Sequence, residues 1–359
     1  MQRVMLFGLL LSVLLSSCGT NKSMIGQEEG LKSGFEEERH YEIMASRLDS
    51  PWAIDFSAES IYVSERDGYI VKINSGETTR QIVNLSRPVD QLSESGFLGF
   101  ILSPDFKDSR QAYAYHSYQE ADAMLNRIVK LEERDGEWHE IEALLEGIPG
   151  NIVHDGGRLA FGPDGMLYAT TGDAGQGELA QDLNSLAGKI LRLTPTGAVP
   201  EDNPFPDSYV YSYGHRNPQG LGWDQSGRMF SVEHGPSGEP GGHDELNLIV
   251  PGGNYGWPSI IGDDTKEGMK PPLYHTGDNT LAPSGMAIDD AGYMIVTGLA
   301  GEKLVRFTPE GKEEDVLLEG EGRIRDVRFF DGQLYVITNN TDGRGTPGEN
   351  DDRLLRLKY

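Results

Sequence analysis

The sequence predicts an all-β fold, a six-bladed β-propeller of four-stranded antiparallel blades. The first observation behind this prediction is a repeated pair of strands: an apolar strand, a short turn with Gly, Asp or Ser, and a strand rich in aromatic or β-branched residues. Six copies occur, at 52–56 with 61–63, 98–102 with 112–115, 159–168, 221–230, 286–295 and 327–335. They recur every ~40 to 65 residues, a spacing that propeller blades with insertions also show.

The second observation is a third strand after most copies, in which apolar and basic residues alternate. It occurs at 70–73, 128–131, 190–193, 304–307 and 354–357, while the fourth copy carries the acidic and apolar segment 245–250 instead. Alternation with a period of two indicates a half-buried strand. Pro163-Asp164-Gly165 and Ser226-Gly227 favour hairpin turns inside two of the copies.

The segment 41–45 precedes the first copy and is expected to be the outer strand of the last blade. Such pairing would close the ring and remove two open sheet edges. A β-sandwich would also contain many short strands, but the regular order of strand, turn, strand and strand favours the propeller.

The N-terminus is typical of an exported lipoprotein. Arg3 precedes a mainly apolar run at 4–15, which is too short to span a membrane and ends in Leu15-Ser16-Ser17-Cys18. This ending resembles the bacterial lipoprotein box, and Cys18 is the only cysteine. A chance cysteine beside an ordinary signal peptide is the alternative. We therefore predict a lipoprotein signal peptide at 1–17, a lipidated Cys18 that begins a flexible tether at 18–38, a propeller domain at 39–359, and a cell-envelope location.

The charge of the chain excludes one class of partner. The formal net charge is −26, whereas binding to nucleic acid phosphates needs a basic surface. We therefore expect no nucleic acid partner. An acidic surface favours solubility and cation binding.

Unusual polar residues gather where the predicted strands begin and end on one side of the ring. The segments are 154–159, 171–173, 214–221, 233–236, 242–247, 252–258, 280–284 and 323–325. Because equivalent positions in successive blades converge on the propeller axis, these loops are expected to line one central mouth.

Three groups of side chains in these loops suggest chemistry. His154 and Asp173 lie at matching ends of one hairpin, so the carboxylate could orient the imidazole as in a general base; a structural loop histidine is the alternative. Arg323 and Arg325 would share one strand face, which indicates either a bound anion or a buried carboxylate partner. Arg216 could serve the site or simply pin loops together.

The turns at Gly235-Pro236 and Gly253-Asn254 offer carbonyl oxygens, which Ca²⁺ accepts together with carboxylates such as Asp244 and Glu245. These turns could equally be only structural. The spacing of His215, His234 and His243 does not match a zinc site, so we interpret these residues as supporting or surface side chains.

Together, these motifs resemble the soluble, pyrroloquinoline-quinone (PQQ)-dependent aldose (glucose) dehydrogenases of bacteria. The segments that carry the resemblance cover essentially the whole predicted propeller: 96–106, 154–159, 214–221, 233–236, 244–247, 253–258, 282–284 and 323–326. The resemblance implies a six-bladed propeller that oxidises the C1 hydroxyl of an aldose to a lactone and passes the electrons to an external acceptor.

The resemblance also implies roles for single residues. His154 would be the base, Asp173 would orient it, and Arg216 would stabilise charge at the reacting quinone carbonyl. The cofactor contacts would be Arg216, Asn217, Gln219, Thr280, Arg323 and Arg325, with Arg323 over the quinone plane. Calcium would be bound by the Gly235 and Pro236 carbonyls, with Glu245 and Tyr255 as further metal ligands, and would polarise the quinone. Glu94 and His154 would bind the sugar.

Three positions depart from the family pattern. Glu94 replaces a Gln, Val153 replaces an Asp before the histidine, and Ala300 replaces a Lys that contacts the quinone carboxylates. The first two changes concern the sugar, and the third concerns affinity for the cofactor. Two other functions stay open: a non-catalytic propeller that binds a glycan or protein partner on the cell envelope, and a Ca²⁺-dependent hydrolase.

Overall fold

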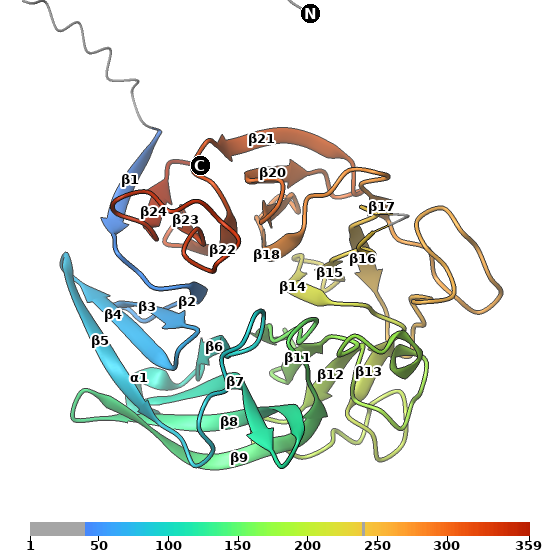
Figure 1. The fold of residues 1–359 in the computed structure, drawn as a ribbon, viewed down its shortest axis with the longest axis horizontal. Coiled ribbons are helices and arrows are strands. Elements are labelled where there is room, and N and C mark those ends of the chain that lie inside the picture. Colours follow the sequence, from blue (N-terminus) through green and yellow to red (C-terminus); the bar gives the residue numbers. More distant parts are fainter. Residues whose placement is uncertain (1–39, 239–240) are drawn as a thin grey trace, which may run out of the picture. The chain divides into compact units, whose positions relative to one another are not determined.

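The computed structural model describes residues 40–238 and 241–359 (Figure 1). The predicted signal peptide at 1–17, the lipidation of Cys18 and the tether at 18–38 all concern residues outside this part, so they stay predictions. The regular secondary structure of the described chain is almost entirely β-strand, apart from a short helix α1 (Phe106–Ser109) and a 3-10 turn η1 (Gly177–Ala180). No helix of the described residues is long and apolar enough to cross a membrane.

The described strands form one eight-stranded sheet and four four-stranded sheets. The eight-stranded sheet consists of two antiparallel meanders, joined where β5 runs parallel to β9 at Val83 and Asn84. Its strands are β2 (Pro51–Phe56), β3 (Ile61–Glu65), β4 (Tyr69–Asn74), β5 (Glu77–Asn84), β6 (Phe97–Leu102), β7 (Gln111–Glu120), β8 (Ala123–Arg134) and β9 (Glu137–Pro149).

The four remaining sheets follow in chain order, and each is antiparallel. Their strands are β10 (Leu159–Phe161), β11 (Leu167–Thr171), β12 (Lys189–Leu193) and β13 (Val210–Tyr213); β14 (Pro218–Trp223), β15 (Met229–Glu233), β16 (Glu245–Ile249) and β17 (Tyr274–His275); β18 (Pro283–Ile288), β19 (Met294–Gly298), β20 (Lys303–Phe307) and β21 (Glu313–Glu319); β22 (Ile324–Phe330), β23 (Gln333–Thr338), β24 (Leu354–Leu357) and β1 (Tyr41–Ala45).

The sheets are arranged around a common centre (Figure 1). Strands β2, β6, β10, β14, β18 and β22 contact one another in this order, and β22 contacts β2 again. Strand β1 pairs with β24, with Tyr41 opposite Leu357, so the last sheet contains both ends of the described chain. The predicted strand pairs, the third strands and the closing role of 41–45 are therefore confirmed. Segment 245–250 also forms a third strand, because β16 pairs with β15 despite its different composition.

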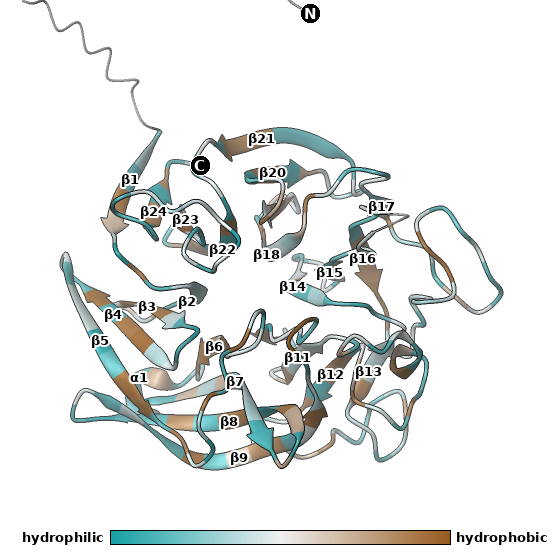
Figure 2. Cartoon of the chain, viewed as in Figure 1, coloured by the Kyte–Doolittle hydropathy of each residue, from teal (hydrophilic) through white to brown (hydrophobic). Residues whose placement is uncertain are grey.

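Apolar residues lie mainly on the strands, whereas most connecting loops are hydrophilic (Figure 2). Between the two meanders of the eight-stranded sheet, the buried ring of Trp138 packs against Phe100 at 5.3 Å and Tyr62 at 5.9 Å between ring centroids. Its indole N–H donates to Gln81 Oε1 at 3.0 Å, so the buried polar atom is satisfied. Packing of this kind makes the sheets rigid supports for the loops at the centre.

Candidate active site

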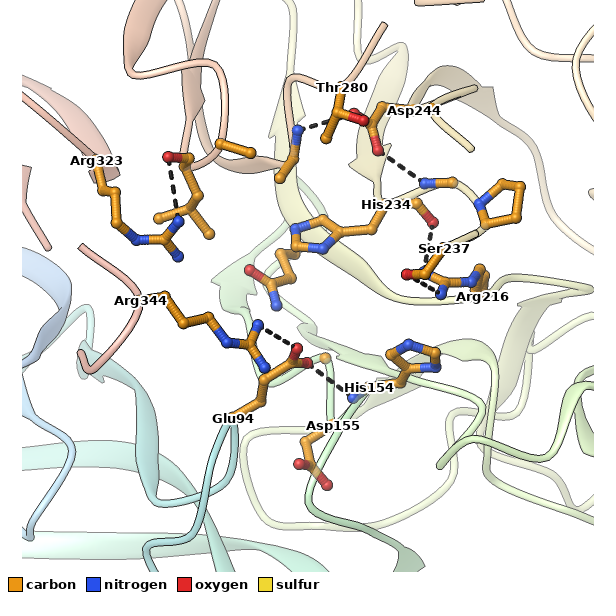
Figure 3. A pocket seen from close by; sticks show the side chains of 18 of the residues that line it. Glu94, His154, Asp155, Arg216, His234, Ser237, Asp244, Thr280, Arg323 and Arg344 are labelled. Carbon is orange, nitrogen blue, oxygen red and sulfur yellow. Dashed lines mark hydrogen bonds and ion pairs between the residues drawn. The ribbon is translucent and has the colours of Figure 1, made fainter. Parts of the chain in front are cut away.

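A cavity of about 450 Å³ lies where the predicted polar loops meet (Figure 3). Most of the predicted site residues line it, although they come from segments far apart in the sequence. These are Glu94, His154, Arg216, Gln219, Gly235, Pro236, Thr280, Arg323 and Arg325. The cavity lining thus agrees with the prediction that these loops form one mouth.

The predicted His154–Asp173 pair is formed. His154 Nδ1 lies 2.7 Å from Asp173 Oδ1, and the histidine side chain is 17% exposed while the aspartate is 2% exposed. Because a carboxylate accepts the hydrogen bond, Nδ1 carries the proton and Nε2 is left as the basic nitrogen. His154 itself lines the cavity, so this nitrogen belongs to a side chain at the cavity wall.

The backbone at His154 adopts a conformation that is uncommon for a residue with a side chain. Its φ is 60°, in the left-handed region. Gly172, one residue before Asp173, approaches it so closely that an added Cβ would lie 1.8 Å from the His154 carbonyl oxygen. The glycine is therefore required where the two loops cross, and it brings Asp173 within reach of the imidazole.

Trp257 connects the acid–base pair to Arg216. Its indole N–H donates to Asp173 Oδ2 at 2.8 Å, and the Arg216 guanidinium carbon lies 5.4 Å from the centre of a Trp257 ring. Arg216 also donates to the Ser237 hydroxyl at 3.2 Å. Burial lowers the pKa of Arg216, although nearby carboxylates including Asp173 and Glu94 oppose the shift. A desolvated guanidinium of this kind would gain from contact with an anionic group.

Arg323 and Arg325 both line the cavity, as their spacing predicts, and they share a buried carboxylate that sequence reasoning did not identify. Asp342 Oδ2 lies 2.9 Å from Arg323 Nη2 and 3.8 Å from Arg325 Nη2. The carboxylate partner considered as an alternative to a bound anion is therefore present. One carboxylate cannot neutralise two guanidinium groups, and burial still lowers the pKa of Arg325 to about 9, against the opposing effect of Asp342.

Several buried nitrogen atoms at the site have no hydrogen-bond partner in the described part of the chain. They are Nε of Arg325 and Nε2 of His234 in the cavity wall, and Nδ2 of Asn217. Asn217, predicted as a cofactor contact, is fully buried and does not itself line the cavity. Asn217 uses its Oδ1 to accept the Gly156 N–H at 3.0 Å, and Gln219 accepts from Arg325 at 2.9 Å. Since native proteins rarely leave buried polar atoms unpaired, the free nitrogens indicate a ligand or water there.

His234 is more important than the sequence indicated. It was interpreted as a supporting or surface residue, whereas the structure places it in the cavity wall. Burial lowers its pKa to about 4, so the imidazole is neutral near neutral pH. The sequence could have placed His234 at the mouth, because it directly precedes Gly235-Pro236, which are predicted to lie there.

Gly235, Pro236 and Asp244 line the cavity, and both oxygens of the Asp244 carboxylate already accept peptide N–H groups. Asp244 Oδ1 accepts the Gly235 N–H, and Oδ2 accepts the Leu281 and Ala282 N–H groups, at 2.7–2.9 Å. Asp244 therefore holds the Gly235 turn and the segment after Thr280 in place.

Glu245 and Tyr255, predicted as further metal ligands, do not line the main cavity. Glu245 borders a space of about 10 Å³ behind it, together with Glu233, Gly235 and Pro236. Burial and the neighbouring Glu233 raise the pKa of Glu245 well above its ordinary value. The Tyr255 ring stacks on His215, and its hydroxyl donates to the Leu248 carbonyl at 2.6 Å. The geometry gives Tyr255 a packing role.

Ala300 lines the cavity, where the resemblance predicts that a lysine is missing. Another cation, Arg344, also lines it and forms an ion pair with Glu94 at 2.7 Å. Sequence reasoning missed both Arg344 and Asp342, which follow β23. The polar run Asn339-Asn340-Thr341-Asp342 follows β23 much as Thr171-Gly172-Asp173 ends β11 and follows it, and this correspondence could have identified the loop.

Comparison with known proteins assigns the chain to a family. Residues 48–356 match the model of the family described as Glucose / Sorbosone dehydrogenase. The chain is 30% identical to an aldose sugar dehydrogenase of Escherichia coli strain K12, across 84% of this chain and 90% of that protein. It is 31% identical to quinoprotein glucose dehydrogenase B of Acinetobacter calcoaceticus across 68% of this chain, a match that spans only 59% of that relative.

A solved structure shows the same fold. The PQQ-bound form of aldose sugar dehydrogenase from Streptomyces coelicolor matches with a TM-score of 0.80 and 39% sequence identity, over 88% of this chain and 96% of that one. The predicted all-β propeller class, the family resemblance and the assignment as a sugar dehydrogenase are thereby confirmed. The chain belongs to the glucose/sorbosone dehydrogenase family of oxidoreductases.

Proposed function

We propose that the protein is a PQQ- and Ca²⁺-dependent aldose dehydrogenase, which oxidises the C1 hydroxyl of a sugar to a lactone on a six-bladed propeller. The observation that carries the proposal is the His154–Asp173 pair, 2.7 Å apart, at the wall of a cavity that four arginines also line. A non-catalytic binding propeller would need neither an oriented base nor this set of cations.

The residues present fit an anionic planar cofactor. The lining includes Arg216, Arg323 and Arg325, and the unpartnered Nε of Arg325 provides a further donor for carboxylate or quinone oxygens. Gln219 and Thr280 lie at the same cavity. When bound, PQQ would supply a two-electron acceptor for the hydride that leaves C1 of the sugar. The PQQ-bound relative supports this cofactor.

The chain's own residues would handle the proton and the developing charge. His154 Nε2 takes the proton of the C1 hydroxyl as the hydride departs, and Asp173 stabilises the resulting imidazolium and keeps its orientation. Arg216, fixed by Trp257 and Ser237, offers a preorganised cation for charge that develops on the acceptor oxygen. The sugar loses a hydride and a proton, which are two electrons and two protons in all, and becomes the lactone that is released.

Calcium would be held mainly by peptide carbonyl oxygens. Gly235 and Pro236 line the cavity, and peptide carbonyls are hard oxygen ligands of the kind that Ca²⁺ prefers. In the described residues, no group of three or more His, Cys, Asp or Glu side chains is placed to hold a metal ion. A calcium ion would therefore depend on backbone carbonyls and cofactor oxygens. The hydrolase alternative, which needs converging carboxylates, gains no support from this geometry.

For the location, we propose a cell-envelope lipoprotein that passes electrons to an external acceptor. The support is the sequence Leu15-Ser16-Ser17-Cys18 after an apolar run. Metabolic labelling with a fatty-acid analogue should mark the wild-type chain and not Cys18→Ala. Labelling of neither protein would contradict the lipid anchor without affecting the enzymatic proposal.

Reconstitution tests the enzymatic proposal. Purified protein is titrated with PQQ, with and without Ca²⁺, and dye reduction is followed with several aldoses. We expect saturable cofactor binding and sugar-dependent dye reduction that a chelator weakens. Absence of cofactor binding and of turnover with every sugar would contradict the proposal, and chelator-independent turnover would remove calcium from it.

A further inference from the structure

Arg344 connects the two sides of the cavity mouth. It belongs to the loop between β23 and β24, and its Nη1 donates to Glu94 Oε1 at 2.7 Å while its Nη2 donates to the Ser93 hydroxyl at 3.2 Å. Figure 3 shows its side chain pointing across the cavity toward Glu94, away from the side where Arg323 lies. The Arg344 side chain is 48% exposed, so it lies at the rim.

Glu94 in turn contacts the residue that carries the base. Its Oε2 accepts the peptide N–H of His154 at 2.9 Å. Burial opposes ionisation of Glu94, but the hydrogen bond from His154 and the nearby His234 and Arg344 lower its pKa to about 2. The ionised carboxylate can only accept hydrogen bonds, and two protein donors leave further acceptor positions on its oxygens.

The backbone around Arg344 fixes this arrangement. The Arg344 N–H donates to Asp342 Oδ1 at 2.9 Å, and the other oxygen of Asp342 pairs with Arg323. An added Cβ at Gly345 would lie 2.6 Å from the Asn340 carbonyl oxygen and 2.9 Å from Arg323 Cδ, so the loop packs tightly here. Arg344 is therefore presented to Glu94 from an ordered loop.

A sugar placed for reaction would meet this pair. If His154 Nε2 takes the C1 proton, the neighbouring hydroxyl donor on the sugar is the one on C2. Glu94, bonded to the backbone of His154, offers an acceptor beside it. Arg344 has five N–H donors in total and uses two of them in the bonds above, so it can also donate to the hydroxyl oxygen.

We propose that Arg344 is a specificity-determining residue of the sugar site, which holds the Glu94 carboxylate in position to bind the C2 hydroxyl of the aldose. This inference rests on the proposed sugar dehydrogenase function. It predicts a preference for aldoses over their 2-deoxy analogues, because a site built to hydrogen-bond a hydroxyl discriminates strongly against a substrate that lacks it.

The test compares kcat/KM for glucose and 2-deoxyglucose in the reconstituted enzyme. Arg344→Met is expected to lower the ratio of the two values about tenfold, the scale of one lost charge-assisted hydrogen bond. Arg344→Lys should retain part of the preference. Arg87→Met is the matched control, because Arg87 is 43% exposed and pairs with Glu120, but does not line the cavity; its ratio should equal that of the wild type.

Two further measurements distinguish a role of Arg344 in sugar binding from a role in PQQ binding. PQQ affinity, followed by spectroscopic titration without sugar, should change by less than about twofold in Arg344→Met. In the background of Glu94→Gln, adding Arg344→Met should alter the sugar ratio less than it does in the wild type, because the charge it pairs with is gone.

Two results would overturn the inference: an unchanged ratio, whether or not both kcat/KM values fall equally, or a loss confined to PQQ affinity. The last would instead make Arg344 the cation that replaces the lysine missing at Ala300. These results differ from a failure of the proposed function, in which the wild-type protein itself would neither bind PQQ nor oxidise any sugar.

Discussion

The two sides of the cavity use a buried aspartate in different ways. On one side, Asp173 accepts hydrogen bonds from His154 Nδ1, the Trp257 indole and the Gly175 N–H. The last two donors hold the carboxylate in place, and the carboxylate in turn orients the imidazole. On the other side, Asp342 pairs with Arg323 and lies near Arg325, so one negative charge is shared between two positive ones.

The difference shows that one aspartate orients a general base, whereas the other supports a site that attracts an anionic ligand. A general base must present one nitrogen in one tautomer, and a carboxylate that faces a single ring provides that. A site for an anion must contain positive charge that the protein itself does not neutralise. One carboxylate between two guanidinium groups stabilises the loop and still leaves a net positive charge. The two interpretations of the Arg323/Arg325 pair, a bound anion and a buried carboxylate partner, are therefore compatible with each other.

The largest expected effect is a loss of kcat when the base on the His154 side is removed. His154→Ala removes the base and should lower kcat by about 10²–10⁴, the usual contribution of general base catalysis. PQQ binding should persist, because the arginine side is untouched. Dye reduction and cofactor titration measure the two quantities. His139→Ala, at a half-exposed histidine on β9, is the control; unchanged turnover in His154→Ala would contradict the assignment.

A smaller loss is expected when only the orientation is disturbed. Asp173→Asn replaces the acceptor for His154 Nδ1–H and for the Trp257 indole by an amide, so the imidazole loses its fixed tautomer. We expect kcat to fall about 100-fold, within the range of general base catalysis. Because both residues act as a unit, Asp173→Asn should cost little more in a His154→Ala background. Additive losses would show that Asp173 acts separately.

On the arginine side, the expected effect is on stability. Asp342→Asn leaves Arg323 and Arg325 without their counter-ion, and breaking a buried ion pair should cost about 3 kcal/mol in the free energy of unfolding of the cofactor-free protein. Added PQQ should then stabilise the variant more than the wild type. Denaturant titrations with and without PQQ measure both. Equal stabilisation of the two proteins would mean that the cofactor does not meet these arginines.

The smallest effect concerns Asp155, which lines the cavity next to His154. Burial raises its pKa from 3.8 to about 7, against hydrogen bonds from Asn126 and the Asn151 N–H, and its Oδ2 has no partner among the described residues. The folded state holds the proton that the unfolded state has lost, so this group destabilises the protein as the pH rises from about 4 to 7.

Asp155→Asn should therefore stabilise the protein at pH 8 by at least ~1 kcal/mol more than at pH 5, since one pKa unit corresponds to about 1.36 kcal/mol. Thermal or denaturant unfolding at the two pH values measures this. A variant whose stability relative to the wild type is the same at both pH values would contradict the shifted pKa.

The sequence predicted the fold better than it predicted the interactions behind the site. Strand pairs follow from local alternation and turn residues, and the polar loops at strand ends identified His154, Arg216 and Arg325. The partners that complete the site come from distant loops without a local pattern. Asp244 was considered as a metal ligand because its carboxylate was visible in the sequence, whereas its three peptide N–H donors were not.

Arg344 illustrates the same limit, since only the ring geometry places it opposite Glu94. Whether a carboxylate binds metal, backbone or another side chain depends on which loops the sheets bring together. Local sequence patterns do not encode that choice.

The pairing of β1 with β24 has a consequence for how the protein acquires activity. The two strands join segments about 310 residues apart, and the Glu94–Arg344 contact spans 250 residues. Contacts of such long range carry a large loop-closure cost and form late in folding. The mouth therefore becomes complete only after the final strand has paired, so a chain truncated before β24 should be unable to assemble its substrate site.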